Sequence, residues 1–111
     1  MIRNRLELHA ELQRILVELG GGKAKDVYYQ PPESVKMEYP AIVYELGRID
    51  PTSANNNYIH KKTQYQITFI TKNPDSQLID AFLDQIQFCS FSRSFKSENL
   101  NHYVYNVASY V

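Results

Sequence analysis

The chain has 111 residues, a length that supports one hydrophobic core and excludes an enzyme built from several domains. Its 12 Lys and Arg residues balance its 12 Asp and Glu residues, so no overall charge draws it to DNA or to an anionic membrane. Aromatic residues make up 13% of the chain, nine of them Tyr, a composition typical of β-sheets and protein interfaces. We therefore expect one domain, residues 1–111, that associates with other subunits.

The N-terminal segment predicts an amphipathic helix over residues 2–19, because leucines and isoleucines recur along one face and charged residues lie on the others. The run Gly20, Gly21 and Gly22 follows directly and ends it, since glycine readily adopts the left-handed conformation of a helix C-cap. The segment lacks the apolar stretch of a secretory signal, and no part of the chain has the roughly 18 apolar residues of a membrane span. With Cys89 as the single cysteine, we expect a soluble protein made in a reducing cytosol.

The next part of the chain predicts two strands and a long loop. Residues 27–29 form a short strand that two prolines bring to an end. Residues 41–46, rich in β-branched and aromatic side chains, form a buried strand. Between Gly47 and Tyr58 the chain is polar and rich in turn-forming residues, so we expect a projecting, mobile loop there, too long for a tight hairpin.

The C-terminal half predicts a strand, a helix and a hairpin. Residues 63–71 alternate apolar and polar, which places Tyr65, Ile67 and Phe69 on one face. The pair Asn73-Pro74 is a helix-start pattern, and the helix after it carries an apolar face that would pack on the sheet. Two strands, residues 88–96 and 102–110, flank a polar turn and form an antiparallel hairpin.

The element order α-β-β-β-α-β-β predicts an α+β fold: a two-layer sandwich with a mainly antiparallel sheet and two helices on one face. The last predicted strand is apolar on both sides, and two helices cannot cover both faces of the sheet. We therefore expect another subunit to cover the second face.

The residue pattern predicts no catalytic or metal site. The three histidines stand in no metal-binding spacing, and Cys89 has no second cysteine beside it. Asp80 and Asp84 lie one helical turn apart, but carboxylates on an outer helical face are usually solvated. With no nucleophile elbow in the chain, we expect neither enzyme activity nor a cofactor.

Basic residues cluster once, at His60, Lys61 and Lys62, with Arg48 at the other base of the predicted loop. Two interpretations stay open: strands that present cations to phosphates, or a solvated edge where lysines discourage unwanted strand pairing. The neutral chain lacks the basic excess of a nucleic-acid-binding domain, which favours the second.

Three stretches carry a resemblance to a known family. They are VYYQPPESVKMEYPAIVY at residues 27–44, KTQYQIT at 62–68 followed by NPDS at 73–76, and NLNHYVY at 99–105. Together they resemble the tail terminator, or tail completion, proteins of long-tailed bacteriophages with non-contractile tails, the siphophages. The shared motifs are structural rather than catalytic, and they cover nearly the whole chain after the first helix.

The resemblance implies a virion protein, assembled in the host bacterial cytoplasm, that forms a ring, typically a hexamer, on the head-proximal end of the tail tube. There it would stop tube polymerisation and present the surface to which the head-tail connector docks, while genomic DNA passes through the lumen. No cofactor, metal or membrane is implied. Candidate contacts with the tube, the connector or the lumen are Arg48, Asp50, Asn55, Asn56, Asn57, His60, Lys61 and Lys62. Candidate inter-subunit contacts are Tyr28, Tyr44, Tyr103, Tyr105 and Tyr110.

Two other functions stay open. A head-side neck or stopper protein shares the virion location, and fold and composition do not separate it from a terminator. A small nucleic-acid-binding module also combines an α+β sheet with exposed aromatic side chains. Such a module needs Lys or Arg among the aromatics, whereas Gln64, Gln66 and Thr68 are uncharged.

Overall fold

The computed structural model describes residues 4–54, 57–74 and 76–110, and the side chains of these residues except those of 52–60 and 110. In chain order the elements are α1 (Arg5–Gly20), a short 3-10 helix η1 (Ala24–Asp26), β1 (Val27–Tyr29), β2 (Ala41–Ala54), β3 (Asn57–Thr71), α2 (Leu78–Gln85), β4 (Cys89–Ser97) and β5 (Leu100–Tyr110). The fold is α+β, as predicted, with two α-helices and a five-stranded mixed sheet.

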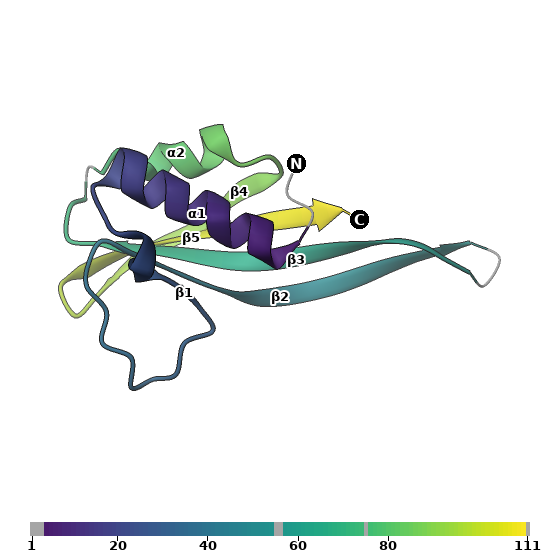
Figure 1. Ribbon diagram of the computed structural model, residues 1–111, viewed down its shortest axis with the longest axis horizontal. Coiled ribbons are helices and arrows are strands. Elements are labelled where there is room, and N and C mark those ends of the chain that lie inside the picture. The colour runs from purple at the N-terminus through teal and green to yellow at the C-terminus, as the bar shows by residue number, and fades with distance from the viewer. Residues whose placement is uncertain (1–3, 55–56, 75, 111) are drawn as a thin grey trace.

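The sheet has the strand order β1-β2-β3-β5-β4. Strand β1 runs parallel to β2, and the other neighbouring strands pair antiparallel. Figure 1 shows α1 and α2 lying over the same face of this sheet. The sheet therefore has one helix-covered face and one helix-free face, with β1 at one edge and β4 at the other.

Helix α1 follows the sequence pattern closely. It begins after Asn4, whose Oδ1 accepts a hydrogen bond from the Glu7 backbone N–H at 2.9 Å. It ends at Gly21, which has a left-handed φ of 69°. The predicted helix began at residue 2, and residues 2–3 lie outside the described part of the chain. The face turned to the sheet is fully buried at Leu8, Leu12, Ile15 and Leu16.

The loop predicted between Gly47 and Tyr58 is wrong: both strands continue through it as a long hairpin. Strand β2 runs on to Ala54 and pairs antiparallel with β3, which begins at Asn57. The turn-forming residues fit because the ladder shifts register next to Gly47, where a β-bulge absorbs one residue. Pro51 also fits, since an edge strand tolerates a missing N–H. We call residues 46–54 of β2 and 57–64 of β3 the hairpin arm.

The hairpin arm projects from the molecule, as the predicted loop was expected to. Figure 1 shows it extending past both helices, and the longest axis of the chain is 51 Å against 29 and 24 Å for the other two. Strand β1 pairs with β2 only as far as Tyr44, and β5 pairs with β3 only as far as Lys62. Within the described residues, the outer part of the arm is therefore a two-stranded ribbon.

Helix α2 begins later than predicted. Ser76 lies two residues before its first residue, Leu78, and the Ser76 Oγ accepts a hydrogen bond from the Leu78 N–H at 3.2 Å. Asn73, the expected cap, instead donates its backbone N–H to the side chain of the last residue of β3 at 3.1 Å. Leu83, one of the apolar residues of this helix, is 41% exposed. Helix α2 is therefore short, and fewer of its apolar side chains pack on the sheet than the sequence indicated.

Strands β4 and β5 form the predicted hairpin, with a tighter turn than expected. Their pairing extends to Ser97 and Leu100, which leaves Glu98 and Asn99 as a two-residue turn. Both turn residues have positive φ, 53° and 65°, as a type I′ hairpin turn requires.

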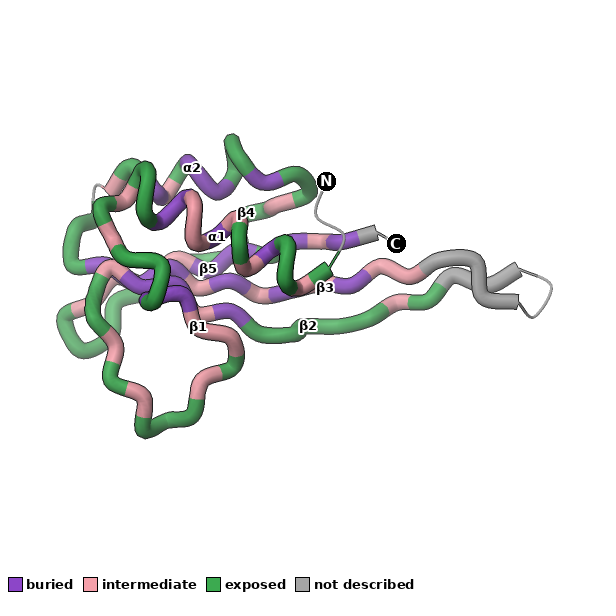
Figure 2. Tube along the Cα trace, viewed as in Figure 1, coloured by how far each residue is buried: buried purple, intermediate pink, exposed green. Residues whose placement is uncertain are grey.

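The hydrophobic core lies between the helices and one face of the sheet. Tyr65, Ile67 and Phe69 of β3 are buried on this face, which confirms the predicted alternation. Figure 2 shows the buried residues gathered where the helices lie over the strands, and exposed residues along β2 towards the hairpin arm. The core cluster consists of Leu8, Leu12, Ile15, Leu16, Val27, Ile42, Tyr44, Tyr65, Ile67, Phe69, Leu78, Ala81, Phe82, Ile86, Tyr105 and Val107.

The helix-free face is more polar than the sequence suggested. Glu45, Gln66 and Asn106 lie side by side across three strands. Three apolar residues, Ala41, Ile70 and Val104, are nevertheless buried outside the core cluster. This face therefore combines a small apolar area with polar side chains that tolerate water.

Candidate assembly surfaces

Arg5, His9 and Tyr44 form a polar cluster between the start of α1 and strand β2. The Tyr44 hydroxyl lies 2.6 Å from His9 Nδ1 and 3.3 Å from Arg5 Nη1. Because a guanidinium only donates, the hydroxyl accepts from Arg5 and donates to His9. That arrangement requires a neutral imidazole, and burial together with the nearby Arg5 charge lowers the pKa of His9. With Tyr44 fully buried, the cluster ties the helix to the sheet.

The thiol of Cys89 is not set up as a nucleophile. The side chain is half-buried at the start of β4, and burial raises its pKa to about 11. The thiol therefore stays protonated at neutral pH. Across residues 4–54, 57–74 and 76–110, no three His, Cys, Asp or Glu side chains are grouped so that they could hold a metal ion.

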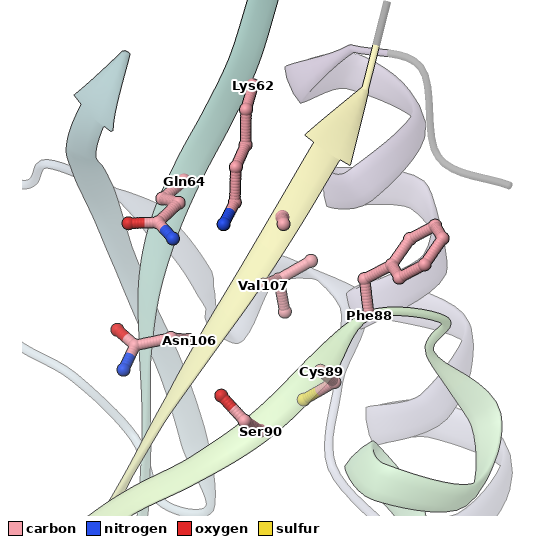
Figure 3. Close-up of a pocket in the computed structure, with 8 residues that line it drawn as sticks. Lys62, Gln64, Phe88, Cys89, Ser90, Asn106 and Val107 are labelled. Atoms are coloured by element: carbon pink, nitrogen blue, oxygen red, sulfur yellow. The ribbon is translucent and has the colours of Figure 1, made fainter. Parts of the chain in front are cut away.

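An open cavity of about 300 Å³ lies beside the start of β4. Figure 3 shows its lining side chains coming from β3, β5 and β4, together with Phe88 directly before β4. The polar ones are Lys62, Gln64, Ser90 and Asn106. The lining includes no carboxylate or imidazole, the usual groups for general acid-base chemistry. Its amides and hydroxyl suit hydrogen bonding to another molecular surface.

On the hairpin arm, Arg48 and Asp50 bind each other. Nε and Nη2 of Arg48 donate to Asp50 Oδ1 at 3.1 and 2.9 Å. The opposite face of the arm is apolar, because the register places Leu46 and Ile49 together there. These two side chains are 42% and 49% exposed. The arm therefore offers an ion pair on one face and apolar side chains on the other.

The predicted basic cluster does not form one patch. Lys61 and Lys62 are consecutive residues of β3, so their side chains leave the ribbon on opposite faces. Lys62 lies opposite Asp50 in the ladder and lines the cavity, whereas Lys61 lies opposite Pro51. The two lysines thus serve different surfaces.

Asn55, Asn56, Asn57 and His60 are the remaining candidate contacts of this segment. The backbones of Asn57 and His60 belong to β3, and their side chains lie outside the described part. Asn55 and Asn56 lie outside it altogether. Their contacts stay a prediction.

Two of the five candidate inter-subunit tyrosines are core residues. Tyr44 and Tyr105 have no exposed surface, and the Tyr105 hydroxyl donates to the Ile79 carbonyl at 2.5 Å. Their burial removes them from the surface available to a second subunit. The alternation of the strands showed which side chains share a face, but it did not show which face the helices cover.

The other candidate tyrosines lie nearer the surface. Tyr28 is half-buried and donates to Asp26 Oδ1 at 3.0 Å. Tyr103 is half-buried and donates to the Pro74 carbonyl at 3.2 Å. Part of each ring therefore stays accessible, and the side chain of Tyr110 lies outside the described residues.

Strand β4 carries an exposed aromatic surface that the sequence did not reveal. Phe91 and Phe95 are 47% and 44% exposed, and a register shift separates Phe91 from Arg93. Phe91 meets the ring of Tyr105 edge-on at 5.4 Å, whereas Phe95 stacks on His102 at 4.6 Å. The bulge thus turns the two rings to opposite faces of the sheet. In the sequence their even spacing places them on one face, and no signal there indicates the bulge.

No family model matches this chain, and no curated protein matches its sequence. Within the described ranges, no helix is long and apolar enough to cross a membrane.

Proposed function

We propose that this protein is a structural virion protein that forms a ring, a hexamer, on the head-proximal end of a phage tail tube. The ring stops tube polymerisation and provides the surface to which the head-tail connector docks. It is assembled in the bacterial cytoplasm, needs no cofactor, and lets genomic DNA pass through its lumen. The class of partner comes from the sequence resemblance, and the support for assembly comes from the shape of the chain.

The observation that carries the proposal is the hairpin arm. A two-stranded ribbon is at best marginally stable alone in water, yet this arm extends past the helices and exposes Leu46 and Ile49 on one face. Packing that face against another protein buries apolar surface and supports the ribbon. An arm of this kind is a device for contact between proteins.

The sheet topology supports a head-to-tail ring. Its two edges differ, since one is the three-residue strand β1 and the other is the longer β4. A contact between unlike surfaces generates a ring when its rotation closes. In this proposal the domain is a two-layer sandwich in the order α-β-β-β-α-β-β, and the helix-free face is left for neighbouring proteins.

Electron microscopy of tail tubes mixed with the purified protein tests the proposal. We expect ring-shaped density on one end of each tube and no further tube growth after its addition. A variant with Leu46→Ser and Ile49→Ser should bind tube ends poorly. Leu83→Ser is the matched control, because Leu83 is an equally exposed leucine outside the arm (41%), and it should bind normally.

Three outcomes contradict the terminator proposal. A protein that stays monomeric and never decorates tube ends has no role in capping them. Binding to the connector without binding to the tube places the protein on the head side, as a stopper. Retention on single-stranded nucleic acid together with absence from tubes favours the nucleic-acid-binding module.

A further inference from the structure

Strand β4 presents an open edge over its full length. It is the last strand of the sheet, it spans Cys89–Ser97, and within the described chain no strand lies on its outer side. Residues 90–97 are all exposed. Such an edge leaves backbone N–H and C=O groups free to pair with an added strand.

The side chains of β4 favour an incoming strand. Because of the bulge, Phe91 stands on the helix-covered face and Phe95 on the helix-free face, each close to half exposed. A strand added at this edge covers part of both rings as well as pairing its backbone. The edge therefore combines hydrogen bonding with apolar contact on both sides of the sheet.

The charge of β4 selects against pairing with itself. Arg93 and Lys96 are its charged residues, and it carries no acid. Pairing two copies of β4 brings four cations together, which like-charge repulsion disfavours. The favoured partner is a segment with acidic and apolar residues in a strand pattern.

Residues 33–39 of the chain have that pattern. Val35, Met37 and Tyr39 alternate with Lys36 and Glu38, the period of a strand with one apolar face. Within the described residues 30–40 no strand forms, although Val35 and Met37 are half-buried. Figure 1 shows the connection between β1 and β2 as a wide loop that leaves the sheet. The pattern is present, and the single chain provides no strand partner for it.

The position of this loop suits a second copy. Glu38 lies 3.3 Å from Lys25 Nζ and 3.8 Å from Lys23 Nζ, contacts that hold one end of the loop near the β1 edge. Glu33, at the other end, is exposed. Since β1 and β4 are opposite edges of one sheet, a head-to-tail rotation brings the loop of one copy towards β4 of the next.

We propose that residues 33–39 of one copy add as a strand to the outer edge of β4 in the neighbouring copy. The inference rests on the proposed ring and names one of its interfaces. The added strand places Glu33 and Glu38 near Arg93 and Lys96, and its apolar side chains near one of the two exposed phenyl rings.

Cysteine cross-linking between two differently labelled chains tests this pairing. Both chains carry Cys89→Ser, which removes the native thiol. One chain carries Lys36→Cys, and the other carries Ser90→Cys, Ser92→Cys or Ser94→Cys. These three positions are exposed along β4, and serine and cysteine are similar in size. Paired strands bring such cysteines within disulfide reach. We expect one of the three positions to cross-link at least about tenfold faster than a control, because assembly raises the effective concentration of the two thiols.

In the control, the second chain carries Asp84→Cys, at an exposed position on α2, in place of the cysteine on β4. Mass photometry of the same samples reports whether rings form. Rings in which no β4 position cross-links faster than the control overturn the strand addition and leave the ring standing. Preferred cross-links in open chains support the strand addition and overturn the closed ring. If neither rings nor preferred cross-links form, both ideas are wrong.

Discussion

The same two strands behave differently in the body of the protein and in the hairpin arm. In the body, Ile42 of β2 and Ile67 of β3 are fully buried beneath the helices. In the arm, Leu46 and Ile49 of β2 are 42% and 49% exposed. The same antiparallel pairing of β2 and β3 runs through both regions, with a bulge next to Gly47. The difference therefore comes from what packs on the strands, and it separates the part that stabilises the fold from the part free to contact other proteins.

Phe82→Ala should have the largest effect on the body. Phe82 is fully buried and packs against the rings of Phe69 at 5.6 Å and Tyr105 at 5.0 Å. We expect the free energy of unfolding, measured with urea, to fall by about 3–5 kcal/mol because the change leaves a cavity. The neighbouring Leu83→Ala should cost less than about 1 kcal/mol. Equal losses would contradict the view that the body depends on this core.

Tyr44→Phe should have the next largest effect. It removes the hydroxyl that accepts from Arg5 and donates to His9, so both partners lose a hydrogen bond at the start of α1. We expect unfolding to become easier by about 1–2 kcal/mol. Hydrogen exchange should speed up most in the first turns of α1, and unchanged exchange there would show that the cluster does not hold the helix.

The pH dependence of stability is a second test of the cluster of Arg5, His9 and Tyr44. The pKa of His9 is lowered in the folded state, first by burial and then by Arg5. The unfolded chain therefore binds a proton at a higher pH than the folded chain. The stability contributed by neutral His9 is fully present above the ordinary histidine pKa of about 6.5 and is lost as the pH falls from there through the lowered pKa of the folded chain. Urea midpoints should therefore drop as the pH falls from about 7 to about 5. His9→Gln should flatten that part of the profile, and an unchanged profile would exclude His9 as its source.

A glycine substitution in the β4–β5 turn should stabilise the protein, in contrast to the substitutions above. Glu98 has a φ of 53°, which a glycine adopts without steric cost. We expect Glu98→Gly to raise the free energy of unfolding by about 1 kcal/mol or less. Ser97→Gly, at the last residue of β4, should lower it instead. If both glycines destabilise the protein, the turn does not strain Glu98.

Ile49→Ser should change stability least of all, by about 0.5 kcal/mol or less, because the side chain is already half exposed. Its effect should appear in assembly, where an arm contact loses apolar surface. Thermal unfolding and mass photometry on the same sample separate the two. A large loss of stability would mean that the arm is part of the core.

The body was largely predictable from the sequence, because its signals are local. The glycine run ended α1, and the alternation of Tyr65, Ile67 and Phe69 placed one face of β3 in the core. The arm was not predictable from the sequence. Its polar residues favour turns in isolation, but here they lie in strands because β2 pairs with β3. The same applies to Tyr44 and Tyr105, whose burial depends on where the helices pack. The placement of Phe91 and Phe95 on opposite faces of β4 depends on a bulge that the residue pattern does not indicate.

Native mass spectrometry of the intact protein and of an arm-shortened chain tests the central claim most directly. In the shortened chain an Asn-Gly turn replaces residues 51–61 and joins Asp50 to Lys62, which are paired in the ladder. The same chain carries Leu46→Ser and Ile49→Ser, which remove the exposed apolar side chains from the remaining part of the arm. We expect the intact protein, alone or with tail tubes, to give one closed ring of uniform mass. The shortened chain should stay monomeric with an unchanged unfolding midpoint. An intact protein that is monomeric under both conditions, or a shortened chain that forms the same ring, would contradict the account.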